Sequence, residues 1–116
     1  MELSEKDITA LKKEKIGILV RNTLPEILKE GLITESEIQK LQKEAYSDLT
    51  FDVKYPVLKK VNPNISILEN RTVNGYTRYY SEPVGNNGIS YLITSELYEK
   101  SIEGYLKWLI RRVKDQ

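Results

Sequence analysis

The stretch covering residues 34–61 constrains the fold of this chain most strongly, because it predicts two helices separated by a turn. Thr34 is followed three residues later by Glu37, which is the pattern of a capping box at a helix start. Apolar residues then recur at helical spacing up to Ala45, so one face of this segment suits burial. We therefore expect an amphipathic helix that begins after Thr34 and ends near Ala45.

The second part of this stretch predicts a turn followed by a short basic helix. Residues 46–51 interrupt the helical spacing and contain a Ser-Asp pair, which is typical of turns. Apolar residues at helical spacing then reappear up to Val61. Because a proline disfavours helical backbone at the residue before it, we expect this helix to begin near Pro56. Asn62-Pro63 would end it after barely two turns.

Two further helices are predicted before this stretch. Ser4 resembles an N-cap, and apolar residues at near-helical spacing extend the first helix from about Glu5 to about Arg21. Thr23 resembles the cap of a second, short helix, because a proline in the first turn and an acid three residues later follow it. Gly31 would end that helix in a left-handed conformation.

A β-hairpin is the clearest strand signal in the chain. Residues 77–84 and 89–93 are rich in strand-forming residues, and Gly85-Asn-Asn-Gly88 between them favours a tight turn. Pro83 cannot donate a backbone hydrogen bond, so we expect its strand to lie at an edge of the sheet.

A last helix completes the order of the predicted elements. Ser95 is placed to cap it, acidic residues occupy its first turn, and a wide apolar face continues to Val113. The whole pattern predicts an α+β fold: N-terminal helices with a helix-turn-helix-like pair, a β-hairpin wing and a C-terminal helix. We expect residues 1–116 to form a single domain.

The absence of cysteine and histidine excludes most catalytic and metal-binding chemistry. The chain lacks a thiolate nucleophile, the commonest general base and the commonest zinc ligands. Its carboxylates suit helix caps and solvated surfaces, and no glycine-rich phosphate loop occurs in the sequence. We therefore expect no enzymatic activity, no metal and no cofactor.

Hydropathy predicts a chain without a membrane partner. No apolar run approaches the roughly 20 residues that a membrane-spanning helix needs. The N-terminal residues are rich in charge and lack the apolar core of a signal peptide. Because the chain also lacks cysteine, we expect it to be cytoplasmic.

The formal net charge is +1, but basic residues are concentrated in the middle of the chain. Residues 51–80 carry five bases and two acids, which gives a local charge of +3. This imbalance indicates a local basic patch, although ordinary solvated lysines would give the same counts. The five bases are Lys54, Lys59, Lys60, Arg71 and Arg78.

Several short sequences resemble a known domain type over about residues 24–113. They are Gly31-Leu-Ile-Thr, Tyr46-Ser-Asp, Tyr55-Pro-Val-Leu, Arg78-Tyr-Tyr, Pro83-Val, Tyr91-Leu-Ile and Trp108-Leu. In this order they resemble the small winged-helix-like domains that are often appended to bacterial restriction and mobile-element nucleases. The resemblance implies target recognition on behalf of a partner nuclease, with no catalysis in this chain.

The leading functional hypothesis is a non-catalytic DNA-binding domain that places a helix in the major groove of double-stranded DNA beside a hairpin wing. Lysines on the short basic helix would contact phosphates, since phosphate neutralisation dominates DNA affinity. The arginines would add phosphate or groove contacts, and the asparagines at the hairpin tip would form the wing. The candidate DNA-binding residues are Lys54, Tyr55, Lys59, Lys60, Arg71, Arg78, Asn86 and Asn87.

The alternative hypothesis is a protein-interaction or dimerisation module that uses the tyrosine-rich hairpin and the last helix around Trp108. If exposed, the hairpin tyrosines could form a protein interface or stack unpaired bases. If half-buried, they are ordinary strand residues. The hairpin tyrosines are Tyr76, Tyr79, Tyr80 and Tyr91.

Overall fold

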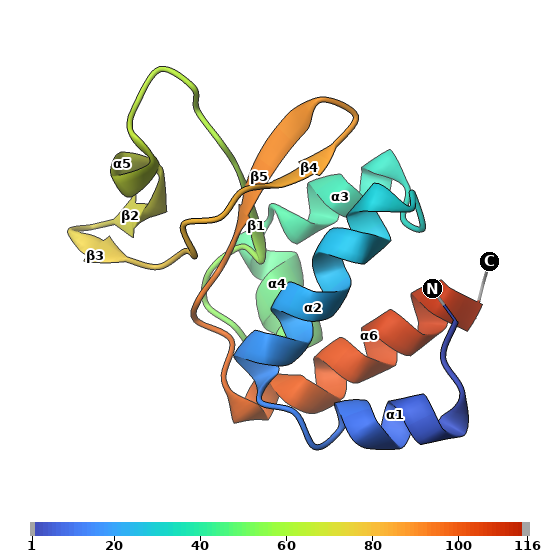
Figure 1. Cartoon of the computed structure of the whole chain (residues 1–116). Coiled ribbons are helices and arrows are strands. Elements are labelled where there is room, and N and C mark those ends of the chain that lie inside the picture. The colour runs from blue at the N-terminus through green and yellow to red at the C-terminus, as the bar shows by residue number, and fades with distance from the viewer. Residues whose placement is uncertain (1, 115–116) are drawn as a thin grey trace.

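The computed structural model describes residues 2–114, apart from the side chain of Asn86. Helices form most of the body, a small antiparallel sheet lies along one side, and a short arm projects from that side (Figure 1). This arrangement confirms the predicted α+β class, with helices in the N-terminal part and a helix at the C-terminal end.

The elements are arranged in this order along the described chain. The helices are α1 (Glu5–Leu11), α2 (Ile16–Lys29), α3 (Glu35–Leu41), α4 (Glu44–Phe51), α5 (Ile67–Arg71) and α6 (Ile102–Lys114), and a 3-10 turn, η1 (Glu99–Ser101), precedes the last. The strands are β1 (Leu58–Lys60), β2 (Thr72–Val73), β3 (Tyr76–Thr77), β4 (Val84–Asn86) and β5 (Ile89–Ile93).

The main sheet is antiparallel, with the strand order β1-β5-β4. β4 and β5 form a hairpin, and positive φ angles of 50° at Asn87 and 79° at Gly88 confirm the predicted tight turn, but the first strand is β4 and not the predicted residues 77–84. β4 lies at an edge of the sheet directly after Pro83, as the missing N–H of that proline predicts. β2 and β3 form a separate two-stranded hairpin in the arm.

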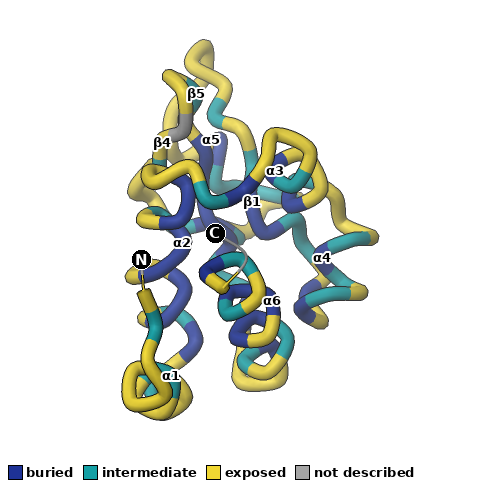
Figure 2. The backbone as a smooth tube through the Cα atoms, turned by 90° about the vertical axis from the view of Figure 1, so that its right-hand side faces the viewer, coloured by how far each residue is buried: buried dark blue, intermediate teal, exposed yellow. Residues whose placement is uncertain are grey.

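The core lies between α2, α6, α4 and the sheet. Leu19, Leu24 and Ile27 on α2 have no exposed surface, and neither has Leu109 on α6. Figure 2 shows buried backbone along α2 and α6, whereas α1 is mostly exposed. None of the helices within residues 2–114 is both long enough and apolar enough to span a membrane.

The predicted boundaries of the first two helices are wrong. The chain breaks between α1 and α2, because α1 buries no residue that would hold one continuous helix against the core. Thr23 caps nothing: it is buried inside α2, and its hydroxyl donates to the Leu19 carbonyl oxygen and contacts the Tyr105 hydroxyl, both at 2.7 Å. The capping box at Ser4 and the left-handed Gly31 are confirmed.

In the stretch of residues 34–61, the predicted start of the first helix is confirmed, but the predictions for the residues that follow this helix are wrong. The capping box of Thr34 and Glu37 opens α3, which ends at Leu41. α4 occupies the predicted turn, so the closely spaced helix pair is α3 and α4, and α4 carries no basic residue. Residues 58–60 form β1 instead of a basic helix, because pairing with β5 outweighs the local helical spacing.

The crossing of α4 and α6 gives a test of this packing. A Cβ added to Gly104 would lie 2.3 Å from the carbonyl oxygen of Thr50, so a side chain at this position pushes the two helices apart. We expect Gly104→Ala to lower the free energy of unfolding by about 1–3 kcal/mol, as overpacking does, and thermal denaturation measures it. Gly85→Ala is the matched control, because the nearest atom to its added Cβ is 3.9 Å away. Equal midpoints for the two variants would contradict this account.

Candidate binding groove

A groove of about 560 Å³ runs along the outer edge of β1 and brings together four of the predicted site residues. The α3–α4 connection and the segment before β1 form one wall, and the arm forms another. We call it the basic groove, and its lining residues are Gln42, Glu44, Lys54, Tyr55, Pro56, Leu58, Lys59, Lys60, Val73, Asn74 and Tyr79.

A buried serine positions the wall of the groove against the helices. The hydroxyl of Ser47 accepts the N–H of Val57 at 3.1 Å and donates to the carbonyl oxygen of Leu41 at 3.4 Å. Ser47 has no exposed surface, so both bonds are shielded from water. This contact joins α4, the end of α3 and the start of β1 at one point.

Tyr79 is a buried residue beneath the groove, with 2% of its surface exposed. Its hydroxyl donates to the carbonyl oxygen of Pro56 at 2.8 Å, and burial raises its pKa well above the ordinary value. The ring therefore stays neutral and fixed. The Lys59 ammonium lies 5.6 Å from the ring centroid, within the range of a cation–π contact.

The arm consists of residues 62–77, and the buried side chain of Asn70 holds its base together through hydrogen bonds that stay within the arm. The Asn70 side chain accepts the N–H of Asn62 at 2.7 Å and donates to the Asn62 carbonyl oxygen at 3.0 Å. Lys59 donates to the Asn70 carbonyl oxygen at 2.7 Å. Where the chain leaves the arm, the Arg78 N–H donates a hydrogen bond to the Arg71 carbonyl oxygen at 2.8 Å.

The three lysines of the groove differ in whether their ammonium groups already bond to other residues of the chain. Lys54 pairs with Asp48 at 2.9 Å, and this hydrogen bond raises the pKa of the lysine. The pair is largely exposed, so it is weak and exchangeable. Lys59 is engaged by the arm, whereas Lys60 is exposed and makes no ion pair within residues 2–114.

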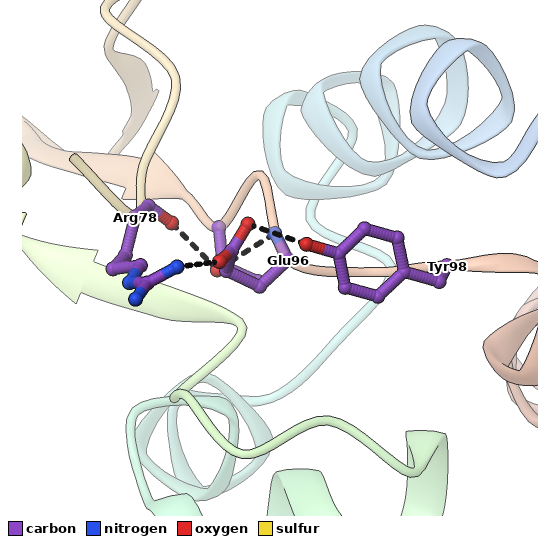
Figure 3. Close-up of polar contacts among 4 residues, drawn as sticks. Arg78, Glu96 and Tyr98 are labelled. Carbon is purple, nitrogen blue, oxygen red and sulfur yellow. Dashed lines mark hydrogen bonds and ion pairs between the residues drawn. The ribbon is translucent and has the colours of Figure 1, made fainter. Parts of the chain in front are cut away.

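The two predicted arginines are engaged inside the chain. Arg71 donates through Nε to the Tyr79 carbonyl oxygen at 2.9 Å. Arg78 forms a half-buried ion pair with Glu96, which also accepts the Tyr98 hydroxyl at 3.0 Å (Figure 3). The hydrogen bond that Arg78 donates to the Glu96 carboxylate raises the pKa of Arg78. These bonds stabilise the body and leave the arginines less free for phosphate contacts.

The structure therefore gathers part of the predicted DNA-binding set and separates the rest. Lys54, Tyr55, Lys59 and Lys60 line one groove, but they lie on a loop and a strand and not on the expected helix. The Arg78 guanidinium is next to them, 5.3 Å from the ring centroid of Tyr55.

The tip of the β4–β5 hairpin is not part of the basic groove. Asn87 lines a different cavity, between that hairpin and the α2–α3 connection. The backbone of Asn86 belongs to β4, and its side chain lies outside the described part of the chain.

The structure buries three of the aromatic residues that the alternative hypothesis places at an interface. Tyr79 and Tyr91 are each 2% exposed and Trp108 is 5% exposed, so none of them presents a ring surface to a partner. Trp108 packs against Phe51 with ring centroids 5.8 Å apart. These large rings are used in the core, where burying apolar area contributes most to stability.

The exposed apolar residues lie elsewhere, mainly on the arm, where the sequence has no regular periodicity. In the arm, Ile65 is 41% exposed, Ile67 38%, Leu68 59% and Tyr76 65%. One signal in the sequence could have located this hairpin. Asn74-Gly75 is the favoured pair for a tight hairpin turn, and both residues have positive φ.

Comparisons with known proteins leave the function to be argued from this geometry. No protein-family model, curated protein or solved structure matches the chain. Within residues 2–114 no group of three or more acidic side chains is placed to hold a metal ion.

Asn70 provides a test of how the arm is held. In Asn70→Ala the arm loses its side-chain bonds to Asn62, and each lost bond costs about 0.5–1.5 kcal/mol. We expect amide hydrogen exchange to accelerate about tenfold or more across residues 62–71, with the protection of α2 and α6 unchanged. Asn64→Ala alters an exposed amide in the same arm and serves as the control. Uniform loss of protection over the whole chain would contradict a local role.

Proposed function

We propose that this chain is a non-catalytic module that binds another protein. The observation that carries the proposal is the exposed apolar surface of the arm, formed by Ile65, Ile67, Leu68 and Tyr76. Several exposed apolar residues gathered on one projecting element are typical of protein-interaction sites. Hydrogen bonds from Lys59 to the Asn70 carbonyl oxygen and from Arg71 to the Tyr79 carbonyl oxygen join the arm to the body, and they use none of these apolar side chains.

The chemistry next to the arm supports the same function. The Arg78 guanidinium lies 5.0 Å from the ring centroid of Tyr76 and 5.3 Å from that of Tyr55. Tyrosine and arginine are enriched at protein interfaces and at the positions that contribute most of their binding energy. Because Glu96 fixes the guanidinium, the two rings are positioned before a partner arrives.

The proposal predicts that arm substitutions remove binding without affecting the fold. We expect the double variant Leu68→Ser, Tyr76→Ser to lose a partner that wild type retains in cross-linking from the native cell extract. Measured with the purified partner, Kd should rise about thirtyfold or more, because each central interface residue contributes about 2 kcal/mol.

Leu49→Ser is the matched control for this experiment. Leu49 is 88% exposed, which is more than any apolar side chain of the arm, but it lies on α4. If both variants lose a partner equally, that partner binds exposed apolar residues nonspecifically and not the arm. If no partner depends on the arm, the proposed function is wrong.

The second candidate function is DNA binding on behalf of a nuclease, which the sequence resemblance implies. The observation that favours it is the gathering of Lys54, Lys59 and Lys60 around one groove. Two of these lysines already have partners in the chain, so fewer counterions would be released than the sequence suggests.

A fluorescent random-sequence duplex tests this second function at two salt concentrations. If the chain binds DNA, affinity should fall steeply with salt and disappear when the three groove lysines are all changed to glutamate. The matched control changes Lys6, Lys12 and Lys13 to glutamate, which alters the net charge equally on exposed positions in and next to α1. Absence of binding at low salt by folded wild type would exclude non-specific DNA association.

A further inference from the structure

We propose that a second cavity, between α2 and the chain that leads into β4, binds a small carboxylate with an apolar body, such as a medium-chain fatty acid. The cavity has a volume of about 500 Å³ and contains no residue of the arm. The inference therefore goes beyond the protein-binding function and does not depend on it. We call this cavity the α2–β4 pocket, and its lining residues are Arg21, Pro25, Lys29, Tyr80, Glu82, Pro83, Val84, Gly85 and Ile93.

Two elements that pack against each other, α2 and β4, form the α2–β4 pocket (Figure 1). Arg21, Pro25 and Lys29 are spaced four residues apart on α2, so they lie on one side of this helix. The opposite wall is the chain before β4 and the start of that strand. The Tyr80 N–H fixes this wall to the sheet, because it donates to a carbonyl oxygen of β5 at 2.9 Å. The pocket is thus held between a helix and the sheet.

Arg21 is the group that would hold the carboxylate, because other residues of the chain fix its guanidinium. Its Nε donates to the Gly17 carbonyl oxygen at 3.0 Å, and its guanidinium carbon lies 4.3 Å from the ring centroid of Tyr80. Gly17 leaves room for this ring, since a Cβ at that position would lie 2.7 Å from the Tyr80 hydroxyl oxygen. Neither contact uses a hydrogen bond of the two terminal nitrogens of Arg21. These nitrogens can therefore donate two parallel hydrogen bonds to a carboxylate.

The charges that line the pocket select a ligand with one negative charge. Arg21 and Lys29 are two cations against one acid, Glu82, so the local charge is +1. Within residues 2–114 neither cation forms an ion pair with Glu82 or with another acid. A carboxylate carries one charge and matches the planar guanidinium, whereas a phosphate monoester carries about −1.5 to −2. The lining therefore favours a carboxylate.

The other lining residues require an apolar body. Pro25, Pro83 and Val84 have no polar side-chain atom, and Ile93 is an apolar residue that is 2% exposed. The volume of about 500 Å³ falls in the usual range of small-molecule sites, about 300–1,000 Å³. A peptide chain would place amide groups against these side chains without hydrogen-bond partners, which is unfavourable. A free acid with a hydrocarbon chain has no such groups, so it fits the pocket better than the C-terminus of a protein.

An NMR titration of the full chain with octanoate and octanamide tests the proposal. The two probes have the same hydrocarbon chain, but octanamide carries no charge. We expect octanoate to bind with a Kd of about 1 mM or below, which a ligand of this size can reach. Octanamide should bind about tenfold more weakly, because it cannot accept charge-assisted hydrogen bonds. Equal Kd values for the two probes would overturn the proposal, and so would the absence of octanoate binding at about ten times the expected Kd.

The same spectra locate the bound acid. We expect octanoate to shift the amide signals of Tyr80, Val84 and Ile93, which line the pocket. The amide of Leu68 should not shift, although its side chain is 59% exposed and apolar. Shifts confined to the arm would mean that exposed apolar residues take up the acid nonspecifically, which overturns the proposal. Acetylated trileucine offers the same carboxylate on a peptide, and tighter binding of this probe than of octanoate would assign the pocket to protein C-termini instead.

Substitutions of the charged groups test how the carboxylate is held. We expect Arg21→Gln to bind octanoate about tenfold more weakly. Arg111→Gln is the matched control, because it removes the charge of an exposed arginine outside the pocket, and it should bind like wild type. Glu82→Gln should bind several-fold more tightly, because it removes the negative charge that lines the pocket. Equal weakening by Arg21→Gln and Arg111→Gln would overturn the proposal. If Arg21→Gln fails to fold, the comparison of octanoate with octanamide on wild type still decides.

Discussion

The antiparallel pairing of β1 with β5 is the interaction on which the other features of this structure depend. It holds residues 58–60 in extended conformation and brings the chain from α4 back across the sheet. Ser47 closes the same junction from the helical side by accepting the N–H of Val57. The three residues of β1 that pair with β5 also line the basic groove. The sheet and the candidate site are thus consequences of a single pairing.

Capping signals in the sequence locate two helix starts correctly and mislead at Thr23 and Ser95, neither of which caps a helix in the structure. The capping boxes at Ser4 and Thr34 depend on residues three apart, and both occur in the structure. The helical spacing at β1 is misleading, since the strand depends on a partner about thirty residues later in the chain. Four of the candidate site residues still meet in one groove, because Lys54, Tyr55, Lys59 and Lys60 are close in sequence whatever the element between them.

Charge counts alone could not show which cations are free. Arg78 is committed to Glu96, an acid eighteen positions away that no local pattern connects to it. Arg71 donates to the backbone carbonyl oxygen of Tyr79, and a count of charged residues cannot predict this bond either. The sequence pattern also fails for an aromatic residue, which it places outside the core although the structure buries it. Helical spacing alone places Trp108 off the apolar face of the last helix, yet it is buried, since the approach of α4 at Gly104 extends the core around it.

The arm leaves and rejoins the body at neighbouring points. Asn62 is tied to Asn70, and Arg71 is tied to Arg78, so the sixteen-position excursion from 62 to 77 closes on itself. It is a surface excursion with a fixed base. Lengthening a surface excursion costs little conformational entropy, about 0.6 kcal/mol for each doubling of its length. The outer residues of this excursion could therefore change in number and kind without any change in the helical body.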